Sequence, residues 1–399
     1  MTLVEPRWDV ARAALADLVQ PLAPVRRPLA ECDRLVLAED LVAQCALPSF
    51  DTSAMDGWAV CGPGPWVIVG QSLAGRPVPG PLSAGQAVVI ATGGVVPPGA
   101  SAVIRSEDGV VDDPSGVAVV AAPDPVGPTH VRPAGEECAA GEVLAVAGTQ
   151  LTPALLGLAV ASGTDALWVV PRPTAALVLF GDELATSGIP EMGRVRDSLG
   201  PQVPAWLERM GVDVVAVEQA EDTLTAHIEA IRRATASADV VLTTGGTAAG
   251  PVDHLHAAIA ACGGEVVVDS VAVRPGHPML AARLAGSGVL ADTATWIVGL
   301  PGNPQSAIVT LMTLGAPILA GLAGREPLPK LAEVPSTEDI GAPAHEDRLV
   351  LGTLTAAGFV PGSHLGSGML RGLAAATGFA VLPPGGVTSG ATVRWLPLP

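Results

Sequence analysis

Three glycine-rich segments each follow an apolar run typical of a buried strand. They are 180–184 (FGDEL), 243–250 (TTGGTAAG) and 300–306 (LPGNPQS). Each alone could be only a tight turn, but ligands of α/β sheets bind outside the carboxyl ends of the strands, so we expect the loops to meet. In the third loop Asn303 can cap a helix that begins at Pro304, whose free N–H groups would then face an anion. The pattern predicts an anion or nucleotide site.

Carboxylates lie in or just after the same loops. Asp182 and Glu183 belong to the first loop, and Asp253 follows the second. Mg²⁺ prefers oxygen ligands and is commonly held by one or two carboxylates together with substrate phosphates, so these residues are candidate metal ligands. Helix capping is the alternative role, above all for Asp253. The sequence has no GxxxxGK[ST] segment, which argues against a P-loop NTPase.

A second group of small polar and acidic residues lies in the N-terminal half of the chain. It comprises 48–59 (PSFDTSAMDGWA), 91–94 (ATGG) and 131–137 (VRPAGEE), which all border short runs typical of strands. Turns containing Asp, Gly and Pro can be purely structural, so these segments alone name no reaction.

The elements expected around these segments differ along the chain. Apolar spacing predicts a helix over 9–18, short strands over 58–131, and a helix over 152–162. Residues 174–322 alternate strands and helices, which predicts a doubly wound parallel α/β domain. Residues 325–399 return to short strands, typical of a small β-barrel or sandwich.

Two helices of the α/β region carry expectations about their ends. We expect Asp222 to cap a helix over 222–235. The uncharged segment 307–324 is barely long enough to span a membrane and contains Pro317, so we expect a buried helix that ends near this proline.

Composition disfavours several classes of protein. The 399 residues include 39 acids against 21 lysines and arginines, a net charge of −18 that disfavours nucleic-acid binding as the main role. The five cysteines form no CxxC, which favours reduced thiols over a disulfide framework or a zinc ribbon. The N-terminus shows no signal-peptide pattern. We therefore expect a cytoplasmic protein without a membrane or nucleic-acid partner.

Taken together, the segments resemble the motifs of the MoeA family, the molybdopterin molybdenumtransferases, whose vertebrate member is the E domain of gephyrin. Residues 49–59 resemble FDNSAMDGYA, and LPGNPQSA at 300–307 is equally specific. Further segments follow in the family's order: ATGG, VRPAGEE, FGDEL, RDSLGP, TTGGTAAGPVD, VRPGHP, DRLV and GSGML.

The resemblance implies a multidomain α/β plus β protomer in four parts. Residues 1–46 and 140–172 would form a discontinuous linking and dimerisation domain, with a β-rich module (47–139) inserted into it. Residues 173–322 would form an α/β domain related to the molybdopterin-adenylylating proteins, and residues 323–399 a C-terminal β-barrel. The family is dimeric, with an active site shared between subunits.

The implied activity is the insertion of molybdate into adenylylated molybdopterin, with release of AMP and assistance from Mg²⁺. A molybdopterin-adenylylating protein and apo-molybdoenzymes are the implied partners of the homodimer. Two alternatives remain open: a paralogue with altered oxyanion use, such as tungstate, or low activity, and a non-catalytic scaffold.

The family's functional residues can be placed on matching positions of this chain. The resemblance implies catalytic roles for Asp56, Thr92, Glu183, Asp222, Asp253, Arg274 and His277, with Glu137 beside the first two. It implies substrate-binding roles for Gly245, Gly246, Pro301, Gly302, Asn303, Pro304, Ser306, Arg348 and Ser367. The implied Mg²⁺ ligands are Asp182, Glu183 and Asp253.

One departure from the family concerns its KPGKP segment, which here is RPGHP. Arg274 and His277 replace two lysines that face substrate or molybdate in the family. Arginine keeps a cation and grips oxyanions with a planar fork, whereas histidine is largely neutral near pH 7 unless an acid or oxyanion raises its pKa. The resemblance therefore leaves open whether this pair supports full activity.

Overall fold

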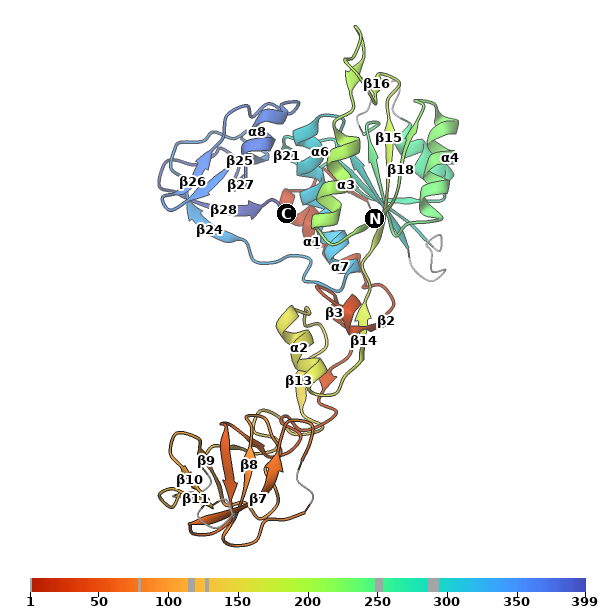
Figure 1. Ribbon diagram of the computed structural model, residues 1–399. Helices are drawn as coiled ribbons and strands as arrows, with labels where there is room; N and C mark the ends of the chain where they lie inside the picture. Colours follow the sequence, from red (N-terminus) through yellow and green to blue (C-terminus); the bar gives the residue numbers. More distant parts are fainter. Residues whose placement is uncertain (1, 78–79, 114–118, 126–128, 248–253, 286–293) are drawn as a thin grey trace. The chain divides into compact units, whose positions relative to one another are not determined.

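The structure is a computed structural model that describes residues 2–77, 80–113, 119–125, 129–247, 254–285 and 294–399. Two compact units divide the chain (Figure 1). Unit 1 contains Met1–Val25, Arg34–Val36 and Val170–Pro399, and unit 2 contains Arg26–Asp33 and Leu37–Val169. The four-part division into domains stays a prediction.

The predicted α/β domain lies in unit 1 and is built on a seven-stranded sheet of order β1-β20-β22-β23-β19-β15-β18. Its strands are β1 (Leu3–Val4), β15 (Thr174–Phe180), β18 (Asp213–Ala220), β19 (Val240–Thr244), β20 (Glu265–Asp269), β22 (Leu280–Leu284) and β23 (Thr295–Leu300). The strands β18, β15, β19 and β23 are parallel, as predicted. The sequence analysis did not predict β22, which runs antiparallel to both its neighbours.

Helices cover both faces of this sheet (Figure 1). They are α1 (Trp8–Leu18), α3 (Leu199–Arg209), α4 (Leu224–Thr235), α5 (Leu255–Ala261), α6 (Pro304–Thr310) and α7 (Ala316–Leu322). The helices α4 and α5 share one apolar core with the strands. The prediction that Asp222 caps α4 is wrong, because Thr223 is the N-cap and its Oγ1 accepts a hydrogen bond from the Ala226 N–H at 3.2 Å.

The helix that begins at Pro304 continues past Pro317, contrary to the sequence prediction. A π-helical stretch, Leu311–Gly315, joins α6 to α7, which ends at Leu322. The wider π turn accommodates a proline that would otherwise clash with the carbonyl one turn earlier. Among the described residues, Pro304–Leu322 is apolar and long enough to cross a membrane, but 89% of its most apolar window is buried in the fold. Packing in the core therefore accounts for its hydropathy.

A C-terminal β-barrel completes unit 1, as predicted. Its strands are β24 (Ala332–Pro335), β25 (Asp347–Thr355), β26 (Gly358–Pro361), β27 (Gly378–Leu382) and β28 (Thr392–Pro397), with the helix α8 at Leu370–Ala375. A bridge between Ser336 and Phe359 closes the path β24-β28-β27-β25-β26. The short strand β21 (Val273–Arg274) pairs in parallel with β25 and so joins the barrel to the α/β sheet.

The β-rich region predicted around 58–131 forms a six-stranded sheet in unit 2, of order β10-β11-β7-β8-β6-β9. Its strands are β6 (Gly57–Val60), β7 (Trp66–Ser72), β8 (Gln86–Ile90), β9 (Ala102–Arg105), β10 (Val110–Asp112) and β11 (Val119–Ala121). Gly57 is required at its position, because its φ is +152° and a Cβ there would lie 1.9 Å from the Ile104 oxygen.

Shorter elements complete the fold. The helix α2 (Pro153–Ala161) begins as predicted, with Thr152 as N-cap and Pro153 in the first turn. The remaining strands are β2 (Val25–Pro28), β3 (Val36–Leu37), β4 (Leu41–Val42), β5 (Thr52–Ser53), β12 (Val131–Arg132), β13 (Val143–Ala145), β14 (Ala166–Val170), β16 (Leu184–Ala185) and β17 (Val195–Arg196). A 3₁₀ turn lies at Leu29–Glu31.

Candidate functional site

A cavity of about 690 Å³ opens in unit 1 where β15, β19 and β23 end. This volume is ordinary for a small-molecule site. All three glycine-rich loops predicted to converge contribute to it, together with the segment before α3 and the loop before α8. The lining residues are Phe180, Glu183, Leu184, Val195, Arg196, Asp197, Ser198, Leu199, Thr244, Gly245, Gly302, Asn303, Pro304, Gly368 and Leu370.

Gly245 is the residue at which the three strand ends meet. Its N–H donates to the Leu300 oxygen at 2.9 Å, and a Cβ at this position would lie 3.2 Å from the Phe180 oxygen. Its φ of +83° is in the left-handed region, which glycine adopts without strain. The glycine therefore lets the ends of β15, β19 and β23 approach one another closely enough to form a single site.

The charges of the cavity come from two carboxylates and one guanidinium. Glu183 and Asp197 are the carboxylates, and among the described lining residues Arg196 is the only cation. One oxygen of Asp197 caps α3 by accepting from the N–H groups of Leu199 at 3.0 Å and Gly200 at 2.9 Å. The sequence analysis quoted this RDSLGP segment but assigned no role to Arg196 or Asp197, although an acid two residues before a helix is itself a capping signal.

The third loop leads into a helix that begins at Pro304, as predicted, and a buried glutamine fixes it in place. Asn303 is the N-cap of α6 and Pro304 lies in its first turn, although the Asn303 side chain makes no capping hydrogen bond. Gln305 is 2% exposed and donates from Nε2 to the oxygens of His364 and Met369, both at 2.7 Å. Its own N–H donates to the Ser367 oxygen at 2.9 Å. Gln305, which the sequence analysis missed, thus holds the Ser367 loop against α6.

The predicted residues divide into those that line the cavity and those beside it. Lining residues are Glu183, Gly245, Gly302, Asn303 and Pro304, and adjoining residues are Gly246, Pro301, Ser306 and Ser367. Asp182 and Asp222 lie together, because the Asp222 N–H donates to Asp182 Oδ1 at 3.3 Å, but neither lines the cavity. Asp253 lies outside the described residues. No group of three His, Cys, Asp or Glu side chains that could hold a metal occurs among the described residues.

Arg274, His277 and Arg348, three further predicted site residues, also lie in unit 1. The register of β21 and β25 places Arg274 opposite Arg348. Arg274 Nε lies 2.9 Å from Glu346 Oε2, and His277 Nε2 lies 3.3 Å from Glu5 Oε1. None of the three lines the cavity. The loop between the first two nevertheless packs on α6, since a Cβ on Gly276 would lie 3.2 Å from the Ser306 oxygen.

The predicted motifs of the N-terminal half converge in unit 2. The strand β5, in the 48–59 segment, pairs with β12, in the 131–137 segment. Asp51 Oδ1 accepts from the Ala134 N–H at 2.8 Å, and the Gly93 N–H donates to the Ser53 oxygen at 2.8 Å. Glu137 is held at the edge of this group by a backbone bond from its N–H to the Leu47 oxygen at 2.9 Å. The three segments therefore form one surface of loops.

Asp56 and Thr92, both predicted site residues, bind each other within this surface. Asp56 Oδ1 accepts from the Thr92 N–H at 2.6 Å and from Thr92 Oγ1 at 3.0 Å. These bonds, the backbone one first, lower the pKa of the Asp56 carboxyl below its ordinary value. The side chain is exposed, so the carboxylate is accessible to a ligand.

Matches to two known families show which class of protein has this fold and this cavity at the strand ends. Residues 176–321 match the family described as "Probable molybdopterin binding domain", and residues 7–163 match "MoeA N-terminal region (domain I and II)". The structure resembles a molybdopterin biosynthesis MoeA protein from Pyrococcus horikoshii, with a TM-score of 0.82, 23% identity and 99% of each chain covered. That likeness concerns the fold alone.

Sequence relatives identify the particular family. Molybdopterin molybdenumtransferase 2 of Mycobacterium tuberculosis is 35% identical over 314 residues, which cover 74% of each chain. Molybdopterin molybdenumtransferase of Synechococcus elongatus is 33% identical over 390 residues, or 93% of each chain. The chain belongs to the MoeA family of molybdopterin molybdenumtransferases.

Proposed function

We propose that this protein is a transferase of molybdenum cofactor biosynthesis that inserts molybdate into adenylylated molybdopterin and releases AMP. Its family and the names of its relatives support the transferase activity. The observation that carries the proposal for this chain is the cavity formed by three glycine-rich strand-end loops, with Glu183 and Arg196 in its wall. Such a site suits a substrate with phosphates and a ring system.

The cavity would hold the adenylylated pterin through three kinds of group. Backbone N–H groups of the loop before α6, at Gly302 and Asn303, would donate to phosphate oxygens, because the N–H groups of Gln305 and Gly245 already donate to backbone oxygens. Arg196 would bind a phosphate with two parallel hydrogen bonds, which its planar guanidinium favours. Thr244, Ser198 and Asn303 would add neutral donors, since they line the same space.

The residues present fit a Mg²⁺ ion bound together with substrate. Glu183 and Asp197 line one cavity, and Mg²⁺ in phosphate-transferring sites is usually held by one or two carboxylates plus phosphate oxygens. Asp182, predicted as a ligand, is exposed beside the cavity. When bound, the ion would neutralise charge on the phosphates as the anhydride bond breaks. Glu183 would otherwise repel the substrate, so the proposal predicts that substrate binding depends on Mg²⁺.

Arg274, His277 and Arg348 would bind molybdate. Arg274 and Arg348 stand opposite each other on paired strands, and two guanidinium groups suit a tetrahedral dianion. The two dithiolene thiols of molybdopterin would replace one oxo ligand of this molybdate, which would leave as water with the two thiol protons. A second candidate function, use of another oxyanion or low activity, is favoured by one observation. Glu346 and Glu5 already contact Arg274 and His277, so an entering anion must compete with two carboxylates.

The deciding experiment mixes the purified protein with adenylylated molybdopterin, Mg²⁺ and molybdate, and follows AMP release and active cofactor. We expect AMP release to require molybdate and to fall at least tenfold in Glu183→Gln, as loss of a cavity carboxylate removes stabilisation of the reaction. If the substrate binds but AMP release does not rise above background, the enzyme hypothesis is rejected and the scaffold hypothesis remains. Parallel assays with tungstate, and with His277→Lys, separate the two oxyanion alternatives.

We further propose that the protein is a cytoplasmic homodimer with its active site shared between subunits. The helix α2 supports a dimer, because its sequence PALLGLAVA is apolar all round yet only Ala159 is buried. Val160 is 61% exposed and Trp168, in β14, is 45% exposed. All five cysteines are free, which is usual in a reducing compartment. A molybdopterin-adenylylating protein would supply the substrate, and apo-molybdoenzymes would receive the product. Light scattering of the purified protein tests the dimer.

A further inference from the structure

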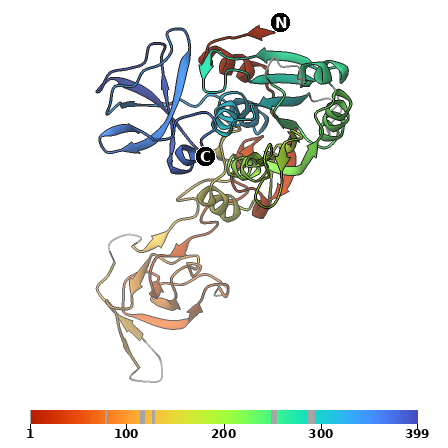
Figure 2. The ribbon, with the colours of Figure 1, turned by 90° about the horizontal axis from the view of Figure 1, so that it is seen from above.

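The N-terminal segment of the chain forms part of the wall beside the Arg274 loop. The strand β1 pairs in parallel with β20 at the edge of the α/β sheet, and Figure 2 shows it in this place. Beyond β1, the Glu5 N–H donates to the Asp269 oxygen at 3.0 Å, and the Ala272 N–H donates to the Pro6 oxygen at 2.9 Å. The N-terminal segment therefore runs alongside residues 268–272 and ends beside the residues just before Arg274.

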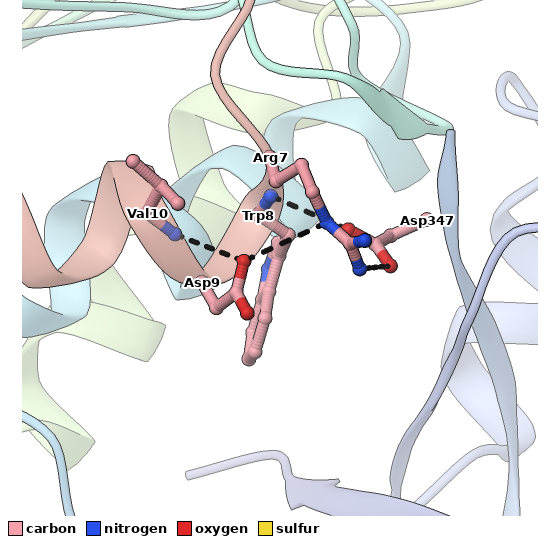
Figure 3. Close-up of polar contacts among 5 residues, drawn as sticks. All are labelled: Arg7, Trp8, Asp9, Val10 and Asp347. Atoms are coloured by element: carbon pink, nitrogen blue, oxygen red, sulfur yellow. Dashed lines mark hydrogen bonds and ion pairs between the residues drawn. The ribbon is translucent and has the colours of Figure 1, made fainter. Parts of the chain in front are cut away.

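One buried carboxylate joins this segment to the barrel. Asp347, the first residue of β25, is 1% exposed. Arg7 Nη2 donates to its Oδ1 at 3.1 Å, and the Trp8 N–H approaches its Oδ2 at 3.4 Å (Figure 3). The Asp347 N–H donates to the Ala272 oxygen at 3.0 Å. Asp347, in the barrel strand β25, thus binds both the start of α1 and the segment just before Arg274.

The surroundings of Trp8 show that the start of α1 is a firm anchor for this carboxylate. Trp8 is 2% exposed, and its Nε1 donates to Thr313 Oγ1, in the π-helical stretch, at 3.0 Å. The guanidinium carbons of Arg12 and Arg394 lie 4.6 Å and 5.2 Å from the centroid of its ring. Arg394 belongs to β28 of the barrel, so α1 contacts the barrel at two places.

The pairing that Asp347 supports is the one that places Arg274 opposite Arg348. The strands β21 and β25 share only two residue pairs, Val273 with Asp347 and Arg274 with Arg348. Like charges on directly paired positions repel each other. Two residue pairs alone hold the register of a strand only weakly. Glu346 offsets part of the repulsion through its contact with Arg274. The buried bonds of Asp347 supply the lateral support that the short pairing lacks.

We propose that Asp347 is a positioning residue for oxyanion binding, which sets the spacing of Arg274 and Arg348 by docking the barrel strand β25 on Arg7 and Trp8. This inference rests on the proposed function of the two arginines. It assigns Asp347 no contact with molybdate or pterin. It therefore predicts that changes at Asp347 or Arg7 weaken the use of molybdate and spare the binding of adenylylated molybdopterin.

The test compares Asp347→Asn and Arg7→Gln with the unaltered protein, using the full chain. Asp347→Asn keeps an oxygen for the Trp8 N–H and removes the charge that Arg7 binds. We expect molybdate binding, measured by calorimetry, to weaken about tenfold in both variants, since small displacements of binding groups cost factors of this size or more. The dissociation constant for adenylylated molybdopterin should stay within about twofold. The double variant should be no worse than the weaker single one, because both changes remove the same contact.

Asp9→Asn is the matched control. Asp9 is the other carboxylate near Arg7, at 3.9 Å, but its side chain is 53% exposed against 2% for Asp347. This variant should leave molybdate binding unchanged. The inference is overturned if folded Asp347→Asn binds molybdate as the unaltered protein does, or if both ligands weaken in parallel with thermal stability. A protein that binds molybdate but releases no AMP would refute the proposed function while the binding comparison still decides this inference.

Discussion

Arg196 is the residue whose chemistry in the cavity can be tested most directly. Replacing it by Gln should weaken the binding of adenylylated molybdopterin at least tenfold, because a charged hydrogen bond contributes roughly 1.5–3 kcal/mol. The affinity of Arg196→Lys should lie between those of the unaltered protein and Arg196→Gln, because lysine keeps the positive charge but lacks the planar guanidinium. Titration calorimetry measures both variants. Arg233→Gln is the control, because Arg233, in α4, pairs with Glu218 of β18 and does not line the cavity. Equal losses in Arg233→Gln would show a general charge effect instead.

Thr92 offers a prediction with a defined direction in pH. Thr92→Val removes the hydroxyl that donates to Asp56 Oδ1 and leaves the backbone N–H bond, so the lowered pKa of Asp56 should rise part of the way toward about 3.9. A lowered pKa stabilises the fold above the unfolded value, and this contribution is lost as the pH falls through the folded value. In the variant this contribution should be smaller, and its loss should be complete at a higher pH. Carbon-13 NMR titration of the Asp56 carboxyl checks the shift, and Thr92→Ser should behave as the unaltered protein.

At the scale of single elements, features set by a local sequence pattern were predicted, whereas features set by contacts between distant segments were not. The adjacent residues Thr152 and Pro153 predict where α2 begins, and the structure confirms it. The end of the helix at Pro317 was mispredicted because a π turn, formed by packing in the core, has no local sequence pattern. The strand β22 was missed because Arg283 interrupts its short apolar run, which only pairing with β20 and β23 makes a strand.

The same division holds for the candidate site. The three glycine-rich loops can be recognised in the sequence because each follows an apolar strand, and all three line the cavity. The opposition of Arg274 and Arg348 could not be read from the sequence, since it depends on a two-residue pairing between segments far apart in the chain. Arg196 and Gln305 lay inside quoted motifs, but only the folded loops show that one lines the cavity and the other is buried.

The start of α3 allows the structural and the catalytic role of one acid to be separated. Asp197→Ala removes the acceptor for two N–H groups and should lower the free energy of unfolding by about 1 kcal/mol, the usual effect of losing a helix cap. Asp197→Asn keeps an acceptor oxygen and should retain most of that stability. Urea denaturation measures both. If Asp197 also helps to hold Mg²⁺, the Asn variant should need more Mg²⁺ for half-maximal AMP release, whereas an unchanged requirement would limit Asp197 to capping.

For the whole molecule, the two clusters of predicted residues lie in different compact units, and this matters for how the protein would work. Asp56 and Thr92 belong to unit 2, whereas the cavity and the arginine pair belong to unit 1. The residues proposed to bind phosphates and the oxyanion all lie in unit 1. A role for Asp56 in the same reaction requires that unit 2 of some chain reaches that ligand, which the proposed dimer with a shared site would provide.

A shared site makes a quantitative prediction for mixed dimers. We expect Asp56→Asn and Glu183→Gln to be nearly inactive as separate homodimers. Coexpression with two different tags should form mixed dimers in about half of the population, and in each of these one site combines the intact Glu183 of one chain with the intact Asp56 of the other. Activity of the unfractionated sample should therefore return to about a quarter of the unaltered protein, and the mixed dimers purified through both tags to about half. Mixed dimers as inactive as their parents would place both residues in one chain's site. Coexpression of Asp56→Asn with a Glu183→Gln, Asp56→Asn double variant is the control and should restore nothing, because no site in that pair has an intact Asp56.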